Sequence, residues 1–473
     1  MQRNRRTWLG AALLAGIAHA ASAGLLRLAG FDSLSDDDHA RVVIAQSFVA
    51  TPRLDPTGTS WLPAPFWLYG AAMMLLGSSL TIARVLAVVT AGASGALLVA
   101  SGAAAGLDPR SSLLAAILPL FLPLVSFLGA APVPELPAAT AVAFALLHLA
   151  SAREAPTWRW FLAAGFLTLA SLSRYEAWIP TAFFALVTAF YGRHRPALLP
   201  ASLLAAAGPL LWLLWNHHAH GHPLAFAHRV AVYRASLGLE PSGLLLYPRA
   251  LLQEAPWALT LGLWATLRVP SMRLPIAGVG GLIVALALAE LRGGAPTHHP
   301  ERTLLAPIFV LIVASVAAIA TLHGRGARPW VLLIALAGCF GALRWRPTRE
   351  GLGADRRKEI ALGLALRSAL PPTERALLVA DSFGFFAVQA ALARPGSLQA
   401  VVPRIIDPRS TTEHDPLETR ETLAEFLRTH PETEWLILRP GQAPWLPEQP
   451  GEQRLPGGRL LRLPLQNQGN PSR

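Results

Sequence analysis

The chain has few charged residues and almost no cysteine. Only 14% of its 473 residues are charged and 53% are hydrophobic, whereas roughly 25% of an average soluble protein is charged. The single cysteine, Cys339, excludes an internal disulfide framework. Lys358 is the only lysine among 40 basic residues. The arginine excess is therefore attributed to genome composition rather than to a requirement for guanidinium chemistry.

Acidic residues are scarce too, 28 against 40 basic ones, which leaves a formal net charge of +12. A strongly basic chain can bind nucleic acid. Here, however, the arginines lie mostly in short loops and form no single stripe with interleaved aromatic residues. We expect no nucleic-acid partner. No internal repeat is visible, and residues 346–473 contain no phosphate-cradling glycine loop.

Long hydrophobic runs, by contrast, recur from Trp8 to Trp345, and about 20 apolar residues suffice to cross a bilayer as a helix. The first run, Trp8 to Gly30, predicts a span, with a cleaved signal peptide as the less favoured alternative. The run at 62–77 starts with two prolines and predicts an interfacial helix. The other expected spans are 80–104, 112–131, 137–151, 160–173, 177–191, 197–215, 256–268, 274–291, 303–322 and 329–345.

These runs predict an α-helical polytopic membrane protein with about 11 transmembrane helices over residues 1–345. Residues 346–473 predict a small C-terminal α/β domain. Its strands are expected near 376–380, 398–402 and 434–438, with helices at 383–393 and 417–429. The proline-rich tail after Pro440 is expected to be loosely ordered.

The arginine distribution over the loops favours a cytoplasmic N-terminus. The C-terminal domain and several polar segments then face the non-cytoplasmic side of the membrane. Those segments are SDDDHAR (35–41), PVPELP (132–137), SRYE (173–176), the loop 216–255 and HHPER (298–302).

Three adjacent carboxylates, Asp36, Asp37 and Asp38, follow the first span. They are explained either as a helix N-terminus capped by Ser35 or as part of a catalytic site. A cap needs only one acidic group, and three adjacent ones repel. Glu135 is either an acid in the first turn of a helix or a second catalytic carboxylate. The catalytic explanation is supported by the high cost of ionisable groups at membrane depth.

Charged residues also stand at the outer ends of two later spans. Arg174 and Glu176 form either a local ion pair beside interfacial aromatic residues or a binding site. Arg302 is either an interfacial anchor or a group that binds an anionic headgroup, since a guanidinium forks onto phosphate oxygens. The histidines of NHHAHGHP (216–223) fit no standard zinc spacing, and no metal site is predicted there.

In order and spacing, these motifs resemble the membrane glycosyltransferases of the GT-C fold. Similar proteins are the bacterial glycosyltransferase family 39, the protein O-mannosyltransferases and the lipid A aminoarabinose transferases. The matching residues are Asp37–Asp38, Pro63 and Pro65, Gly77 and Arg84. NHHAHGHPLAF (216–226) matches with His222 where the family has Asp, and PERTLLAPIF (300–309) matches with Thr303 where it has Tyr.

The resemblance implies transfer of a sugar from a polyprenyl-phosphate donor in the membrane to a glycan, lipid or protein acceptor on the non-cytoplasmic side. It implies Asp37 as general base, with Asp38 and Asp36 as alternatives, and a supporting role for Glu135. Direct attack by the acceptor predicts inversion at the anomeric carbon. No cofactor is implied with certainty; a divalent metal is possible but not required.

Further residues are assigned to binding on the same basis. The donor phosphate is expected to be held by Arg302, Arg174 and Arg84. The substrates are expected to contact Glu176, Tyr175, His39, Trp61 and His218. Two other functions stay open: a lipid or glycan transporter or flippase, and an envelope scaffold protein.

Overall fold

The computed structural model of the chain describes residues 2–151, 155–236, 238, 243–292, 299–322, 328–351, 353–408, 410–448 and 451–463. The chain divides into two compact units. The helical unit comprises Met1–Phe31, Thr57–Pro65 and Arg84–Leu352. The α/β unit comprises Asp32–Pro56, Phe66–Ala83 and Gly353–Arg473. The segment predicted as the C-terminal domain thus forms a compact unit together with two segments from the N-terminal part of the chain.

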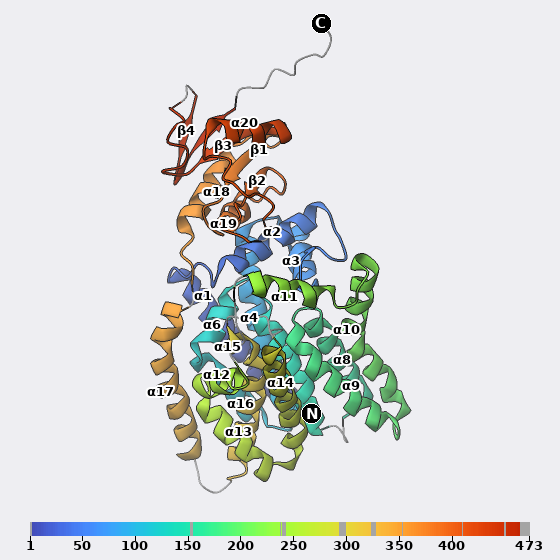
Figure 1. Ribbon diagram of the computed structural model, residues 1–473. Helices are drawn as coiled ribbons and strands as arrows, with labels where there is room; N and C mark the ends of the chain where they lie inside the picture. The colour runs from blue at the N-terminus through green and yellow to red at the C-terminus, as the bar shows by residue number, and fades with distance from the viewer. Residues whose placement is uncertain are drawn as a thin grey trace. The chain divides into compact units, whose positions relative to one another are not determined.

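The helical unit is built from the hydrophobic runs, and Figure 1 shows its helices. A helix, or a bent pair of helices, lies at each expected span. The elements are α1 (Gln2–Leu28), α4 (Leu80–Ala104), α5 (Pro109–Ile117), η1 (Leu118–Phe121), α6 (Pro123–Ala130), α7 (Glu135–His148), η2 (Leu149–Ser151), α8 (Thr157–Ser171), η3 (Tyr175–Ala177), α9 (Trp178–Gly192), η4 (Pro196–Leu198), α10 (Leu199–His220), α11 (Ala225–Ser236), α12 (Leu246–Glu254), α13 (Pro256–Arg268), η5 (Pro270–Met272), α14 (Arg273–Leu291), α15 (Pro300–Thr303), α16 (Leu305–Ala320) and α17 (Arg328–Gly351).

Among the described residues, four helices are long and apolar enough to cross a membrane. They begin near Arg5, Leu80, Pro196 and Pro270. A fifth candidate is the pair Pro109–Phe121 and Pro123–Ala130, which is bent by 85°. The bend lies at Leu122, whose extended backbone precedes Pro123, and proline disfavours helical geometry in the residue before it.

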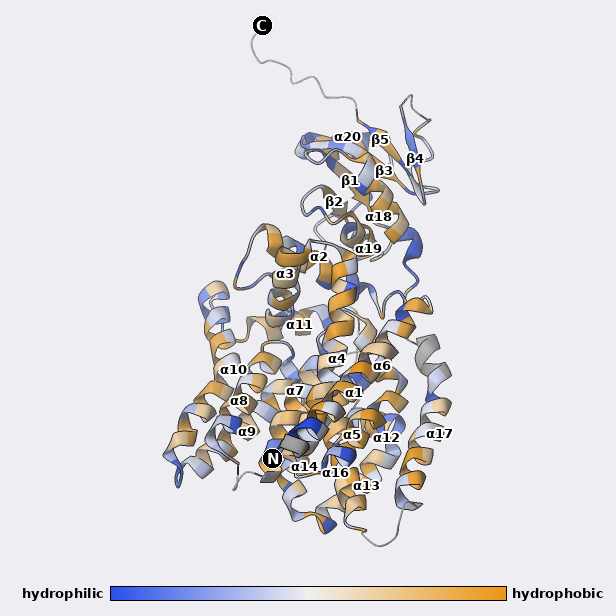
Figure 2. Ribbon diagram, turned by 180° about the vertical axis from the view of Figure 1, so that it is seen from behind, coloured by the Kyte–Doolittle hydropathy of each residue, from blue (hydrophilic) through white to orange (hydrophobic). Residues whose placement is uncertain are grey.

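Helices α7 and α16 form the interior of the helical unit and pack against each other. Both are mainly apolar, and nearly every residue of each is buried, as expected for a helix surrounded by other helices. Helix α13 packs closely on α16 through Gly262, where an added Cβ would lie 2.6 Å from Leu311 Cδ2. In Figure 2 the helices of this unit are coloured mainly toward the hydrophobic end of the scale.

The α/β unit contains a sheet of five strands in the order β2-β1-β3-β5-β4. Strand β1 pairs in parallel with β2 and β3, whereas β5 pairs antiparallel with β3 and β4. The elements are α2 (Asp36–Ala50), most of α3 (Ala64–Leu76), α18 (Arg357–Ala369), β1 (Arg375–Val379), α19 (Phe385–Leu392), β2 (Leu398–Val401), α20 (Arg420–Thr429), β3 (Thr433–Leu438), β4 (Gln453–Leu455) and β5 (Gly458–Arg462).

Two hydrophobic clusters place the helices on opposite faces of this sheet. Helices α18 and α19 cover one face through side chains such as Leu366 and Val388. Helix α20 covers the other through Leu423. The predicted α/β organisation of this segment is confirmed. The expectation of a loosely ordered tail after Pro440 is wrong for β4 and β5, because the Leu460 and Leu461 side chains are buried in these two clusters.

Candidate active site

A cluster of two carboxylates and one arginine lies in the helical unit. Pro134 precedes α7, so Glu135 becomes the first residue of that helix, where a carboxylate favours the helix dipole. Its Oε1 accepts from Arg174 Nη1 at 3.0 Å, and Arg174 Nε donates to Glu176 Oε1 at 2.6 Å. The Glu135 side chain is only 3% exposed. Residues from the start of α7 and from η3 and its N-cap thus form a charge cluster that is largely buried.

Arg302 lines the same cavity as these three residues. The other lining residues are small or apolar, among them Ala138, Leu282 and Thr303. The cavity contains about 10 Å³ of free space, roughly what one water molecule requires. Arg302 Nε and Nη2 are buried and have no hydrogen-bond partner among the described residues. Arg302 thus brings to the cavity lining two donor nitrogens that no described residue engages.

Aromatic packing fixes the neighbouring loop. The Tyr175 ring stacks on Phe226 of α11 with centroids 4.4 Å apart, and its hydroxyl accepts from Trp212 Nε1 at 3.0 Å. Trp178 meets the Phe226 ring at an edge, 5.5 Å away. Tyr175 stands between Arg174 and Glu176 in sequence. These contacts therefore hold the backbone that presents both charged side chains to the cavity.

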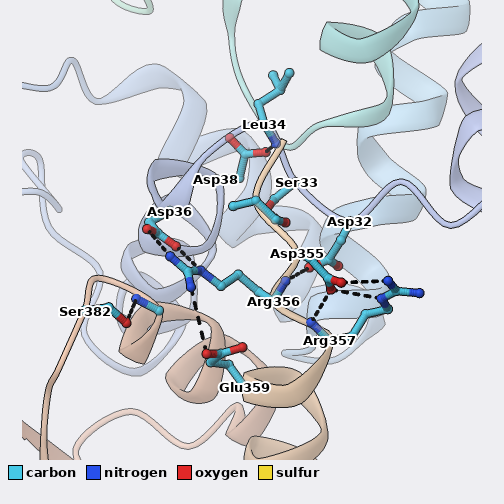
Figure 3. A network of polar contacts seen from close by, with 12 residues as sticks. Asp32, Ser33, Leu34, Asp36, Asp38, Asp355, Arg356, Arg357, Glu359 and Ser382 are labelled. Carbon is cyan, nitrogen blue, oxygen red and sulfur yellow. Dashed lines mark hydrogen bonds and ion pairs between the residues drawn. The ribbon is translucent and has the colours of Figure 1, made fainter. Parts of the chain in front are cut away.

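The three aspartates lie in the first turn of α2, in the α/β unit, and each has a different environment. Asp36 forms a forked ion pair with Arg356, with Nε–Oδ1 at 2.7 Å and Nη2–Oδ2 at 2.9 Å (Figure 3). Asp38 is buried, and its Oδ2 accepts from the Leu34 N–H at 2.7 Å. Asp37 is exposed, and no ion pair or hydrogen bond of its carboxylate is found among the described residues.

Ser35 occupies the expected N-cap position of α2 but does not cap the helix with its side chain. Ser35 is the N-cap residue in extended conformation, but its side chain makes no capping hydrogen bond. The Asp38 carboxylate instead accepts from the backbone of Leu34. The capping explanation therefore accounts for Asp38 and leaves Asp36 and Asp37 to be explained otherwise.

The remaining residues predicted at the site do not line the cavity of Arg302. Arg84 is half-buried on α4, and Trp61 lies in the loop before α3. His39 is buried on α2. His218 is exposed in the last turn of α10, 6.0 Å from the Trp215 ring between centroids. Of the HHPER stretch, His298 lies outside the described residues.

No group of three or more His, Cys, Asp or Glu residues that could hold a metal ion is found in the described part of the chain. His217, His218, His220 and His222 are all exposed.

One charged pair was missed by the sequence reasoning. Glu290, at the end of α14, is 2% exposed by side chain and pairs with Arg234 of α11, Nη2–Oε1 at 3.4 Å. A lone carboxylate at the end of a long apolar run was the available signal. Nearby, burial, helped by the charges of Glu290 and Glu176, raises the pKa of Tyr247 on α12. The ion pair thus joins α11 to the C-terminal end of α14, and α12 also packs against α14.

Comparison with solved structures identifies the architecture. The chain superimposes on the Archaeoglobus fulgidus oligosaccharyltransferase tethered with an acceptor peptide, with a TM-score of 0.54 and 15% identity over 91% of this chain and 69% of that one. ArnT from Cupriavidus metallidurans bound to undecaprenyl phosphate gives a TM-score of 0.53 and 14% identity over 96% of both chains. The fold is of the GT-C type.

Another structure with this fold is AglB from Archaeoglobus fulgidus in complex with an inhibitory peptide and a dolichol-phosphate, at a TM-score of 0.52 and 14% identity over 92% of this chain and 69% of that one. A family model described as dolichyl-phosphate-mannose-protein mannosyltransferase matches residues 57–217. No curated protein matches the chain. The predicted resemblance to GT-C membrane glycosyltransferases is confirmed, and the comparisons agree with the predicted enzyme class and with a multi-pass membrane protein.

Proposed function

We propose that the chain transfers a sugar from a polyprenyl-phosphate donor to a hydroxyl of a glycan, lipid or protein acceptor on the periplasmic side of a bacterial inner membrane. Two proteins with the same fold were solved with polyprenyl phosphates, ArnT with undecaprenyl phosphate and AglB with dolichol-phosphate. Those ligands support the donor class. The distribution of arginines over the loops supports the orientation, with the N-terminus in the cytoplasm.

The observation that carries the proposal is the state of Arg302. Arg174 is already engaged by Glu135 and Glu176, whereas two guanidinium nitrogens of Arg302 have no partner among the described residues. A buried donor without a partner costs free energy, and a phosphate oxygen would satisfy it. We assign the donor phosphate to Arg302 and give Arg174 the role of fixing the two carboxylates.

Asp37 is the proposed general base. Asp36 is engaged by Arg356 and Asp38 by Leu34, so Asp37 is the exposed carboxylate of the three. It takes the proton of the acceptor hydroxyl as that oxygen attacks the anomeric carbon. The bond from the anomeric carbon to the phosphate oxygen breaks, and its electron pair leaves with the polyprenyl phosphate. One direct displacement inverts the anomeric configuration.

Charge stabilisation of the leaving phosphate falls to Arg302 in this scheme. A monophosphate leaves with less charge than a diphosphate, so the scheme does not require a divalent metal.

The test combines donor binding with turnover. The purified full-length chain is supplied with a panel of polyprenyl-phosphate sugars and a mixture of glycan, lipid and peptide acceptors. Wild type is compared with Arg302→Gln and with Arg292→Gln, a control that removes an exposed arginine at the end of α14. We expect transfer from at least one donor. Donor affinity should fall about 10- to 100-fold in Arg302→Gln, because charge-assisted hydrogen bonds are lost, and remain unchanged in the control.

Two results would contradict the proposal. Equal donor affinity in both variants would remove Arg302 from the phosphate site. Tight donor binding without transfer to any acceptor would favour a lipid or glycan transporter instead.

A further inference from the structure

The residues before α2 are joined to the segment that leads into α18, more than 300 positions later in the sequence. The Ala354 N–H donates to Ser33 O at 3.1 Å, and Ser33 Oγ donates to Ala354 O at 3.0 Å. The backbone N–H of Arg356 donates to Asp32 Oδ2 at 3.1 Å. These contacts bring Arg356 to the N-terminus of α2.

The Arg356 side chain binds a carboxylate in the first turn of α2. Its Nε and Nη2 meet the two oxygens of Asp36 in a fork (Figure 3), the geometry in which arginine binds carboxylate most specifically. Both side chains are about one-fifth exposed, so solvent screens the pair only in part. The hydrogen bonds to Asp36 raise the pKa of Arg356, although partial burial opposes this. The charge on Arg356 is therefore permanent.

Arg356 is itself fixed by a chain of charges. Glu359 Oε1 lies 3.9 Å from Arg356 Nη1 and 3.0 Å from Arg439 Nη2. Arg439 Nη1 also meets Asp381 Oδ1 at 2.5 Å. Asp381 follows β1 and Arg439 follows β3, so the network is anchored at the carboxyl ends of two adjacent parallel strands.

The far end of α2 is held by packing. Helix α2 lies against α19, and Gln46, 2% exposed, donates from Nε2 to Ala390 O at 2.9 Å. With Asp36 held by Arg356 and Gln46 held by α19, α2 is fixed at both ends within the α/β unit. Its rotation about its own axis is then also fixed.

We propose that Arg356 is a positioning residue for Asp37. Successive residues of a helix point about 100° apart, so fixing Asp36 sets the direction of Asp37. A helix released at Asp36 would fray in its first turn, which contains Asp37. The C-terminal segment thereby acts as a support for the catalytic carboxylate. This inference rests on the proposed function, in which Asp37 is the general base.

The experiment measures the helix and the reaction separately in the full-length chain. Arg356→Gln is compared with the charge reversal Asp36→Arg/Arg356→Asp. The control is Arg357→Gln, which removes the neighbouring arginine, whose partner is the exposed Asp355. Hydrogen–deuterium exchange of α2 reports its order, with exchange of β1 and β3 as the test of overall folding. Transfer assays give kcat and the KM for donor.

We expect exchange in α2 to rise about 10-fold or more in Arg356→Gln while β1 and β3 stay protected. We expect kcat to fall about 10- to 100-fold, since small displacements of a reacting group are costly. The KM for donor should change little, because the proposed phosphate site is at Arg302. The charge reversal should restore both α2 protection and most of kcat, and the control should behave as wild type.

Unchanged exchange in α2, or a charge reversal that restores no protection, would overturn the tie between Arg356 and α2. Faster exchange with an unchanged kcat would overturn the positioning role. If wild type transfers no sugar at all, the proposed function fails, and with it the catalytic half of the inference. The exchange data would still decide whether Arg356 holds α2. Should Arg356→Gln also lose protection in β1 and β3, the same measurements on Asp36→Asn decide between these outcomes.

Discussion

Removing Arg174 should leave the buried Glu135 carboxylate without its ion-pair partner. The resulting loss of stability can be worked out from the structure. Arg174 Nη1 lies 3.0 Å from Glu135 Oε1. At an effective dielectric constant of about 20, two unit charges at that distance attract by about 5.5 kcal/mol. The Glu135 side chain is 3% exposed, so solvent screening is weak, but desolvation offsets much of the attraction. We expect Arg174→Gln to destabilise the protein by about 3 to 5 kcal/mol.

A double-mutant cycle isolates the pair. The four proteins are wild type, Arg174→Gln, Glu135→Gln and the double variant. Their unfolding in detergent by added sodium dodecyl sulfate can be followed through fluorescence of the 14 tryptophans. We expect a coupling free energy of about 2 kcal/mol. The ion pair between Arg174 and Glu176 has the shorter distance, but its two side chains are 18% and 17% exposed. We expect a smaller coupling free energy for this second pair, about 1 kcal/mol.

The control is the exposed pair of Arg357 and Asp355, whose side chains are 73% and 62% exposed. Hydrogen bonds from Arg357 lower the pKa of Asp355 to about 2, yet exposed ion pairs contribute little to stability. No measurable coupling is expected there. A coupling below about 0.5 kcal/mol for Arg174 and Glu135 would refute the buried cluster.

Three further predictions concern the helical unit. Gly262→Ala should cost about 1 to 3 kcal/mol in the same unfolding assay, because its Cβ would overlap Leu311 on α16. Tyr175→Phe should cost about 1 to 2 kcal/mol, since it leaves the buried Trp212 indole N–H without its acceptor. Asp108→Ala should cost about 1 kcal/mol at neutral pH by removing the N-cap of α5. Burial by itself would raise the pKa of Asp108, but hydrogen bonds from the Ser111 side chain and from nearby backbone N–H groups outweigh it and lower the pKa. The stability difference between wild type and Asp108→Ala should therefore be present above pH 3.8, the ordinary pKa, and disappear as the pH falls through the lowered pKa of the folded state.

The helices were predictable because an apolar run long enough to cross a bilayer must satisfy its backbone hydrogen bonds within the segment, as a helix does. Runs such as 80–104 and 274–291 coincide with α4 and α14 to within a residue. The three central strands were predictable for a similar reason, as short apolar runs between amphipathic segments. The hairpin of β4 and β5 was overlooked, because its apolar stretch is short and surrounded by proline.

The candidate site was predictable only in part. Glu135, Arg174, Glu176 and Arg302 could be assigned to one face of the membrane, and the structure places them around one cavity. The sequence could not show that Arg174 is paired with carboxylates whereas two nitrogens of Arg302 have no partner among the described residues, because this depends on side-chain geometry. The pairing of Asp36 with Arg356 is also invisible in the sequence. The two residues are 320 positions apart, and no local pattern relates them.

The central claim is tested most directly by the rate of sugar transfer in Asp37→Asn. Asparagine keeps the size of the side chain and removes its basicity, and binding of the polyprenyl-phosphate donor is measured on the same preparation. The account predicts a fall in kcat of about 100-fold or more with donor affinity retained, while Asp38→Asn serves as the comparison at the adjacent carboxylate. An Asp37→Asn enzyme that transfers sugar at the wild-type rate would contradict the assignment of the base.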